Sequence, residues 1–162
     1  MYKFIFSALA FFSSAIAVAD DLQGKVVTVI DGNTLQILCQ NDETHTVRLL
    51  GIDSPELSQE YGEESRKHLE RIVLGRKVTV TFKGKDWRGN TLAVVLVNGK
   101  KDPRVELLDE GLAWTAEKNP TPDLEACRTR AQQKGVGLWK QSNPTPPWTY
   151  RRQQTMLQPK TS

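Results

Sequence analysis

Residues 47–56 are Val47-Arg-Leu-Leu-Gly-Ile-Asp-Ser-Pro-Glu56, and this stretch joins a predicted β-strand to a predicted functional site. Its first half continues the alternation of polar and apolar residues that begins at Thr44, which is typical of a half-buried strand, and it carries Arg48. The strand ends at Asp53-Ser-Pro-Glu56, where two carboxylates and a hydroxyl fall within four residues. Pro55 restricts its own backbone and that of Ser54, so the sequence predicts a rigid turn rich in oxygen ligands.

Oxygen donors crowded on a rigid turn suit a divalent cation such as calcium. A neighbouring arginine suits a phosphate group. Two simpler interpretations stay open. In the first, the stretch is only a charged turn after a strand. In the second, Arg48 and Glu56 form a buried salt bridge that holds the turn in place.

The periodicity of the chain predicts an α+β fold, a five-stranded OB-like β-barrel capped by three helices. Strand-like patterns alternate with turn residues, and a helical pattern follows the third strand and recurs near the end. The expected strands cover residues 25–30, 34–39, 44–50, 77–83 and 91–97, and the expected helices cover 58–74, 104–112 and 123–134.

The first 19 residues have the features of a secretory signal peptide. Lys3 is their only charge, an apolar run follows it, and Ala17-Val-Ala19 supplies a cleavage pattern of small residues. We therefore expect an exported protein, periplasmic or secreted, without stable membrane insertion after cleavage, because the apolar run is short for a membrane span. An uncleaved membrane anchor is the alternative.

The remaining chain is expected to form one domain over residues 20–141, followed by a Pro-rich basic tail, 142–162, with little regular structure. All 19 acidic residues precede Ala126. The basic residues after that point are Arg128, Arg130, Lys134, Lys140, Arg151, Arg152 and Lys160. Such a block attracts nucleic acid, with Arg151 and Arg152 as expected contacts, or it is a solvated helix face and tail.

The chain has two cysteines, Cys39 and Cys127. Export permits a disulfide between them, which is the tentative expectation, and two buried free thiols are the alternative. The only histidines are His45 and His68, so neither a cysteine nucleophile with a histidine base nor a zinc site is expected.

Trp87 falls in the polar loop between the fourth and fifth expected strands. An exposed indole beside Arg88 could stack on a nucleobase. A tryptophan in a loop can equally anchor that loop to the barrel, and the sequence leaves both interpretations open.

Several short motifs occur together in one order. They are Asp31-Gly-Asn-Thr34, Val47–Glu56, Tyr61-Gly62, Asp86-x-x-Gly89 with Leu92-Ala93, Gly111-Leu-Ala-Trp114 and Gly137-Leu-Trp139. This order resembles that of staphylococcal-nuclease-like (thermonuclease) domains from about Gly24 to Trp139. The tail motif Pro147-Trp-x-Tyr-Arg-Arg152 is similar to that of exported bacterial members. The resemblance implies an OB barrel with three helices and calcium-dependent cleavage of DNA and RNA, and we expect a monomer holding one Ca²⁺ ion.

The resemblance also implies roles for individual residues. The metal-ligand positions fall on Asn33, Asp53 and Ser54, where Asn33 replaces the aspartate of the family and removes one negative charge. Glu56 falls on the proposed general base, and Arg48 on the first of two phosphate-binding arginines.

The second family arginine would fall at Asn90, so Arg88, two residues earlier, is the expected replacement and the third expected catalytic residue. The leading hypothesis is an exported, metal-dependent nuclease with little sequence preference. The alternative is a nuclease-like domain, weakened or inactive in catalysis, that only binds nucleic acid or another polyanion.

Overall fold

A computed structural model describes residues 21–157 of this chain. The predicted signal peptide, residues 1–19, lies outside the described residues and stays a prediction. Within 21–157, every helix is too short or too polar to cross a lipid bilayer.

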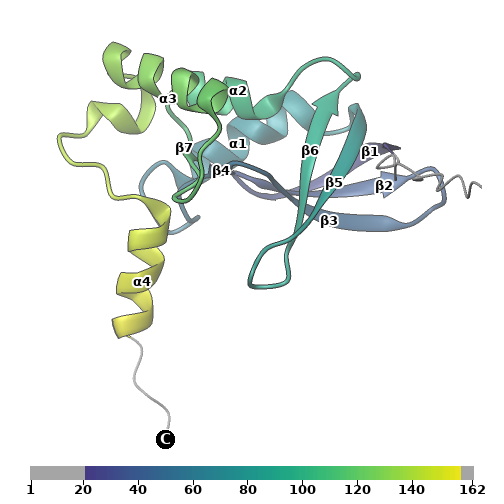
Figure 1. The fold of residues 1–162 in the computed structure, drawn as a ribbon, viewed down its shortest axis with the longest axis horizontal. Helices are drawn as coiled ribbons and strands as arrows, with labels where there is room; N and C mark the ends of the chain where they lie inside the picture. The colour runs from purple at the N-terminus through teal and green to yellow at the C-terminus, as the bar shows by residue number, and fades with distance from the viewer. Residues whose placement is uncertain (1–20, 158–162) are drawn as a thin grey trace, which may run out of the picture.

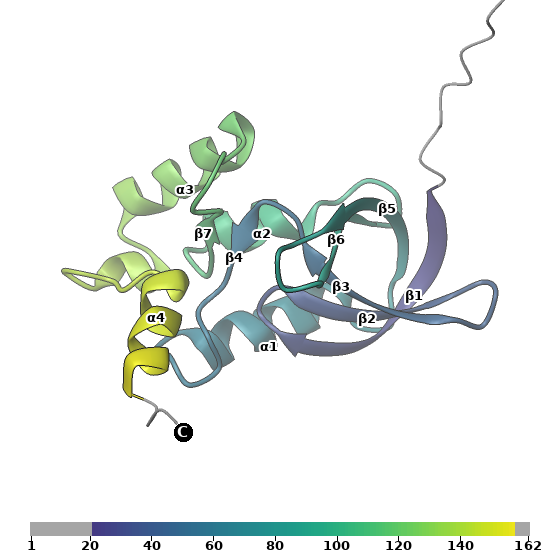
Figure 2. The same ribbon diagram turned by 60° about the horizontal axis from the view of Figure 1, so that its bottom comes forward.

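Five strands close into a barrel in the order β1-β2-β3-β6-β5, as Figures 1 and 2 show. Neighbouring strands are antiparallel except β3 and β6, which run parallel where Arg48 lies opposite Leu92. This arrangement confirms the predicted OB-like barrel. The strands are β1 (Leu22–Asp31), β2 (Thr34–Cys39), β3 (Thr44–Leu49), β5 (Lys77–Lys85) and β6 (Thr91–Val97).

Alternation along the strands fills the barrel with β-branched and leucine side chains, because successive side chains of a strand point to opposite faces. Fully buried members include Val26, Leu35, Ile37, Val47 and Val95. Helix α1 (Gly62–Val73) adds Leu69 and Val73 to the same core. It begins four residues later than predicted, because Tyr61 has a left-handed backbone, φ 65°, that a helix cannot include.

Two further helices pack against each other beside the barrel, as expected. Helix α2 (Pro103–Asp109) is capped by Asp102, whose carboxylate accepts a hydrogen bond from the backbone N–H of Arg104. Helix α3 (Pro122–Lys134) is followed by the short 3-10 helix η1 (Gly137–Lys140). A separate two-stranded sheet pairs β4 (Ile52–Asp53) with β7 (Trp114–Thr115) and joins the 47–56 stretch to this helical layer.

The C-terminal segment contradicts one prediction. Instead of little regular structure, it contains helix α4 (Pro147–Leu157), which stands to one side of the barrel in Figures 1 and 2. Proline at the first helical position is compatible with a helix start. Trp148 packs edge-on against Trp114 with ring centroids 5.7 Å apart, and that contact fixes the helix against β7. Residues 21–157 thus contain four α-helices, where three were expected.

The tentative disulfide is also wrong. Cys39 and Cys127 are both free and buried. Cys39 ends β2 at the β2–β3 hairpin, and Cys127 lies in α3, on opposite sides of the molecule in Figure 1. An oxidising compartment permits a disulfide only where the fold brings the two α-carbons close together.

Candidate active site

The 50–56 turn is held by tertiary contacts on both sides. Asp53 pairs with Trp114 of β7. The carbonyl oxygen of Leu50 accepts a hydrogen bond of 2.7 Å from Nη1 of Arg104, in α2. Because pairing and hydrogen bonding restrict the backbone before and at Asp53, its carboxylate is presented in one direction.

Two glycines let neighbouring segments approach this turn. A β-carbon at Gly62 would lie 1.9 Å from the carbonyl oxygen of Glu56, so only glycine lets α1 begin there. A β-carbon at Gly32 would lie 2.6 Å from Cβ of Ser54. The hydroxyl of Ser54 donates a hydrogen bond of 2.8 Å to the carbonyl oxygen of Gly32. The two turns that carry the predicted ligands are thereby joined.

The three expected metal-ligand residues lie together and are almost fully buried. Asn33 and Ser54 are each 3 % exposed, and Asp53 is 8 % exposed. With its amide oriented to satisfy both neighbours, Asn33 donates to Oδ1 of Asp31 at 3.1 Å and accepts from Nη2 of Arg48 at 3.0 Å. The structure thus places the three residues side by side, and their role as metal ligands stays a prediction.

Arg48 contacts the predicted metal ligand rather than the predicted base. Its Nη2 lies 3.2 Å from Oδ1 of Asp53. Glu56 is paired instead with Arg151, at 2.7 Å from Oε1 to Nη1. The alternative of an Arg48–Glu56 salt bridge is therefore wrong. Arg48 pairs with Asp53, and Glu56 pairs with Arg151.

Arg151, from α4, lies at the centre of this site. Besides Glu56, it binds both oxygens of Asp53, with Nη1 3.2 Å from Oδ1 and Nη2 2.6 Å from Oδ2. Burial opposes its charge, but the hydrogen bonds to Asp53 and Glu56 outweigh burial and raise the pKa of Arg151. From the sequence, we expected Arg151 to contact nucleic acid. Its ion pairs with Asp53 and Glu56 were not predicted. Its one sequence signal was the Pro147-Trp-x-Tyr-Arg-Arg152 motif.

The 86–90 loop is organised by Asp86. Its Oδ1 accepts hydrogen bonds of 2.9 Å from the backbone N–H groups of Arg88 and Asn90, and its Oδ2 accepts one of 2.8 Å from the Asn90 amide. Burial acts to raise the pKa of Asp86, but these bonds and the charge of Arg48 together lower it. The guanidinium of Arg88 stacks over the ring of Trp87, 4.6 Å from its centroid. Trp87 is 86 % exposed, so it does not anchor the loop to the barrel.

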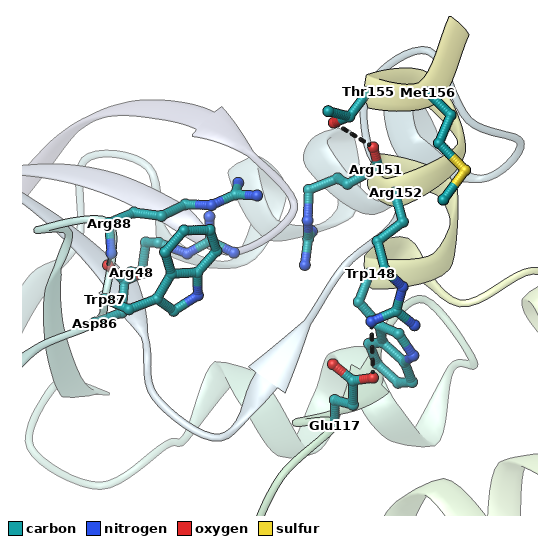
Figure 3. Close-up of a pocket in the computed structure, with 10 residues that line it drawn as sticks. All are labelled: Arg48, Asp86, Trp87, Arg88, Glu117, Trp148, Arg151, Arg152, Thr155 and Met156. Atoms are coloured by element: carbon teal, nitrogen blue, oxygen red, sulfur yellow. Dashed lines mark hydrogen bonds and ion pairs between the residues drawn. The ribbon is translucent and has the colours of Figure 1, made fainter.

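A pocket of about 460 Å³ opens between this loop and α4. Figure 3 shows Arg48 and Arg88 extending toward Arg151 from the barrel side, while Arg151 reaches in from α4. The lining residues are Arg48, Asp86, Trp87, Arg88, Glu117, Trp148, Arg151, Arg152, Thr155 and Met156. The pocket therefore presents four arginines and one exposed indole.

A second pocket, of about 270 Å³, adjoins the first through Arg48, which lines both. Asn33, Ser54 and Glu56 also line it. The ion pair of Arg151 with Glu56 joins a residue of the first pocket to a residue of the second. The structure thus brings six of the predicted site residues together around these contacts. They are Asn33, Arg48, Asp53, Ser54, Glu56 and Arg151. Trp87, Arg88 and Arg152 line the first pocket.

Asn33, Asp53 and Ser54 match a calcium ion in donor type but not in charge. All three offer hard oxygen atoms, yet only Asp53 carries a formal charge, and guanidinium groups already contact both of its oxygens. Within the described part of the chain, no three acidic, histidine or cysteine side chains gather closely enough to hold a metal ion.

Known nucleases resemble this chain over most of its length. The family described as "Staphylococcal nuclease homologue" matches residues 46–141. An uncharacterized endonuclease of Escherichia coli is 34 % identical over 93 % of this chain and 98 % of its own length. An uncharacterized endonuclease of Haemophilus influenzae is 38 % identical over 80 % of this chain and 73 % of its own. A micrococcal nuclease of Shigella flexneri is 32 % identical over 82 % of each chain. The family match begins within β3 and covers the 50–56 turn, β5, the 86–90 loop and β6, so this chain belongs to the staphylococcal nuclease family.

Proposed function

We propose that this protein is a nuclease that hydrolyses phosphodiester bonds of DNA, RNA or both. One observation carries the proposal. A carboxylate in the position of a general base, Glu56, adjoins a pocket lined by four arginines, in a chain of a nuclease family. Arginine matches phosphate oxygens in charge and in planar geometry, so this pocket suits a nucleic-acid backbone.

The proposed chemistry uses two side chains, Glu56 and Arg48. Glu56 accepts a proton from a water molecule in the second pocket, and the water oxygen attacks phosphorus. The bond from phosphorus to the leaving oxygen breaks, and that oxygen takes a proton from solvent. Arg48 offsets the negative charge that develops on the phosphate oxygens.

Little sequence preference is expected from the groups that line the pocket. Arg48, Arg88, Arg151 and Arg152 contact backbone phosphates, which carry no sequence information. Trp87 offers an exposed ring on which any base can stack. Single-stranded substrates are favoured because their bases are free to reach the indole.

Calcium is the cation that we propose for this enzyme. Asn33, Asp53 and Ser54 would hold it once the guanidinium groups of Arg48 and Arg151 turn away from Asp53. A bound calcium ion would supply positive charge that favours binding of a phosphate. Because Asn33 contributes no negative charge, we expect the ion to be held weakly.

We further propose that the protein is exported to the periplasm or the exterior and acts as a monomer. The pattern of residues 1–19 supports export.

A second candidate function is binding of nucleic acid without cleavage. It is favoured by Asn33 and Asn90, which put neutral amides where the family has charged residues. Against it stands Glu56. A domain kept only for binding has no chemical need for a carboxylate beside an arginine pocket, where it repels phosphate.

A direct assay separates the two functions. Purified protein is incubated with labelled single-stranded DNA and RNA, with calcium, with manganese or with a chelator. We expect cleavage that increases with calcium concentration and is lost in the matched variant Glu56→Gln. Tight binding without cleavage under every condition would replace the nuclease proposal with the binding function.

A further inference from the structure

We propose that Arg151, in the C-terminal helix, is the second phosphate-binding arginine of this active site and contacts the reacting phosphate. This inference rests on the proposed nuclease function. It assigns a catalytic role to a helix that lies outside the matched family region, 46–141.

Arg48 and Arg151 already converge on a single oxygen atom. Nη2 of Arg48 and Nη1 of Arg151 each lie 3.2 Å from Oδ1 of Asp53. Two guanidinium groups that can bind one carboxylate oxygen from two sides can also bind one phosphate oxygen, which has a similar size and charge. The pair forms a clamp from β3 and α4 at the junction of the two pockets.

The 86–90 loop does not supply this second arginine. The side chain of Asn90 is committed to Asp86, at 2.8 Å. Arg88 stacks on Trp87, and within residues 21–157 its guanidinium forms no ion pair with Asp53 or Glu56. The expectation that Arg88 replaces the lost family arginine therefore has weaker geometric support than Arg151.

Helix α4 is held in place by several contacts that do not involve Arg151. The hydroxyl of Tyr150 lies 3.0 Å from Oγ of Ser58. The Gln59 amide hydrogen-bonds the carbonyl oxygen of Thr145, just before the helix. Trp148 also packs edge-on against Trp114. Because the helix is anchored at separate points, Arg151 is directed at the site by packing as well as by charge.

The contacts of Arg151 also explain how the two carboxylates of the site are paired before substrate binds. Its guanidinium places one positive charge between Asp53 and Glu56, two carboxylates that repel each other and repel phosphate. When a phosphodiester enters, the guanidinium can transfer its hydrogen bonds to the phosphate oxygens. That exchange releases Glu56 to accept a proton from water and places the arginine where negative charge develops.

Single-turnover cleavage of single-stranded DNA, with enzyme in excess, tests the assignment. Arg151→Ala should slow cleavage by about 10²–10³-fold, the cost of removing one oriented donor. Arg151→Lys should recover only a small part, because an ammonium cannot make the paired contacts. Added guanidinium ion should partly restore the rate of Arg151→Ala. The matched control is Arg130→Ala, which removes an arginine that pairs with Asp109 away from the site and should cleave like wild type.

Two results would overturn the inference while leaving the nuclease function intact. The first is wild-type or faster cleavage by a folded Arg151→Ala, which would make Arg151 irrelevant or an inhibitory plug over the carboxylates. The second is a large rate increase in Asn90→Arg, which would show that the second arginine is still missing.

A wild-type protein that cleaves nothing would overturn the proposed function and the catalytic role together. Binding of an uncleaved oligonucleotide, weakened by Arg151→Ala but not by Arg130→Ala, would then leave Arg151 only as a phosphate contact.

Discussion

Nη1 of Arg151 lies 2.7 Å from Oε1 of Glu56, a contact between residues 95 positions apart in the sequence. It joins the C-terminal helix to the turn that carries the proposed general base. The same guanidinium holds Asp53, so one side chain links the expected cation site, the base and the arginine pocket.

Glu56→Gln tests the role of the base. An amide cannot take a proton from water at neutral pH, so the cleavage rate should fall by about 10²–10⁴-fold. The lost ion pair with Arg151 is partly exposed and should contribute at most about 1 kcal/mol to stability. Cleavage rate and thermal melting are measured on one preparation. A large loss of stability with full activity per folded molecule would instead give Glu56 a structural role.

Asn33→Asp tests the expected cation site. A carboxylate there adds one negative charge beside Asp53, so calcium affinity should rise by about tenfold or more. Isothermal titration calorimetry measures this affinity directly, and cleavage should be no slower. Asn41→Asp, at an exposed turn away from the site, is the matched control for added charge. Equal calcium affinity in Asn33→Asp and wild type would show that residue 33 is not a ligand.

Trp148→Ala tests whether α4 must be docked for activity. The variant removes the edge-on contact with Trp114, so it should destabilise α4 by about 1 kcal/mol or more. Limited proteolysis should then cut within residues 141–157 while the barrel stays intact, and the cleavage rate should fall. Trp148→Phe keeps an aromatic ring and should retain most activity. Full activity with a proteolytically released α4 would contradict the need for docking.

Asp86→Asn tests the organisation of the 86–90 loop through its pH dependence. The pKa of Asp86 is lowered in the folded protein, so its hydrogen bonds stabilise the fold fully above the ordinary aspartate value, about 3.9. This stabilisation is lost as pH falls through the lowered pKa. Melting temperatures of wild type and variant should differ at neutral pH and converge in acid. A constant difference across that range would show that Asp86 does not act through its charge.

The sequence was sufficient for features that depend on local pattern. The alternation in residues 34–39 and 91–97 predicted two strands at their observed bounds, because a half-buried strand repeats every two residues. The motif around Asp53 and Glu56 predicted the turn, and the resemblance it carried identified the family that the comparisons confirm.

Other features depended on contacts between distant segments. The separation of Cys39 from Cys127 follows from where the barrel places β2 and α3, which no spacing in the sequence encodes. The tail appeared unstructured because it is Pro-rich, yet Trp148 finds a packing surface on Trp114 that exists only after β7 pairs with β4. Arg151 reaches Asp53 and Glu56 because this contact and the Tyr150–Ser58 hydrogen bond hold α4 beside the turn. Local pattern therefore determined the barrel and the residues of the turn, while tertiary packing alone decided that Arg151 pairs with Asp53 and Glu56.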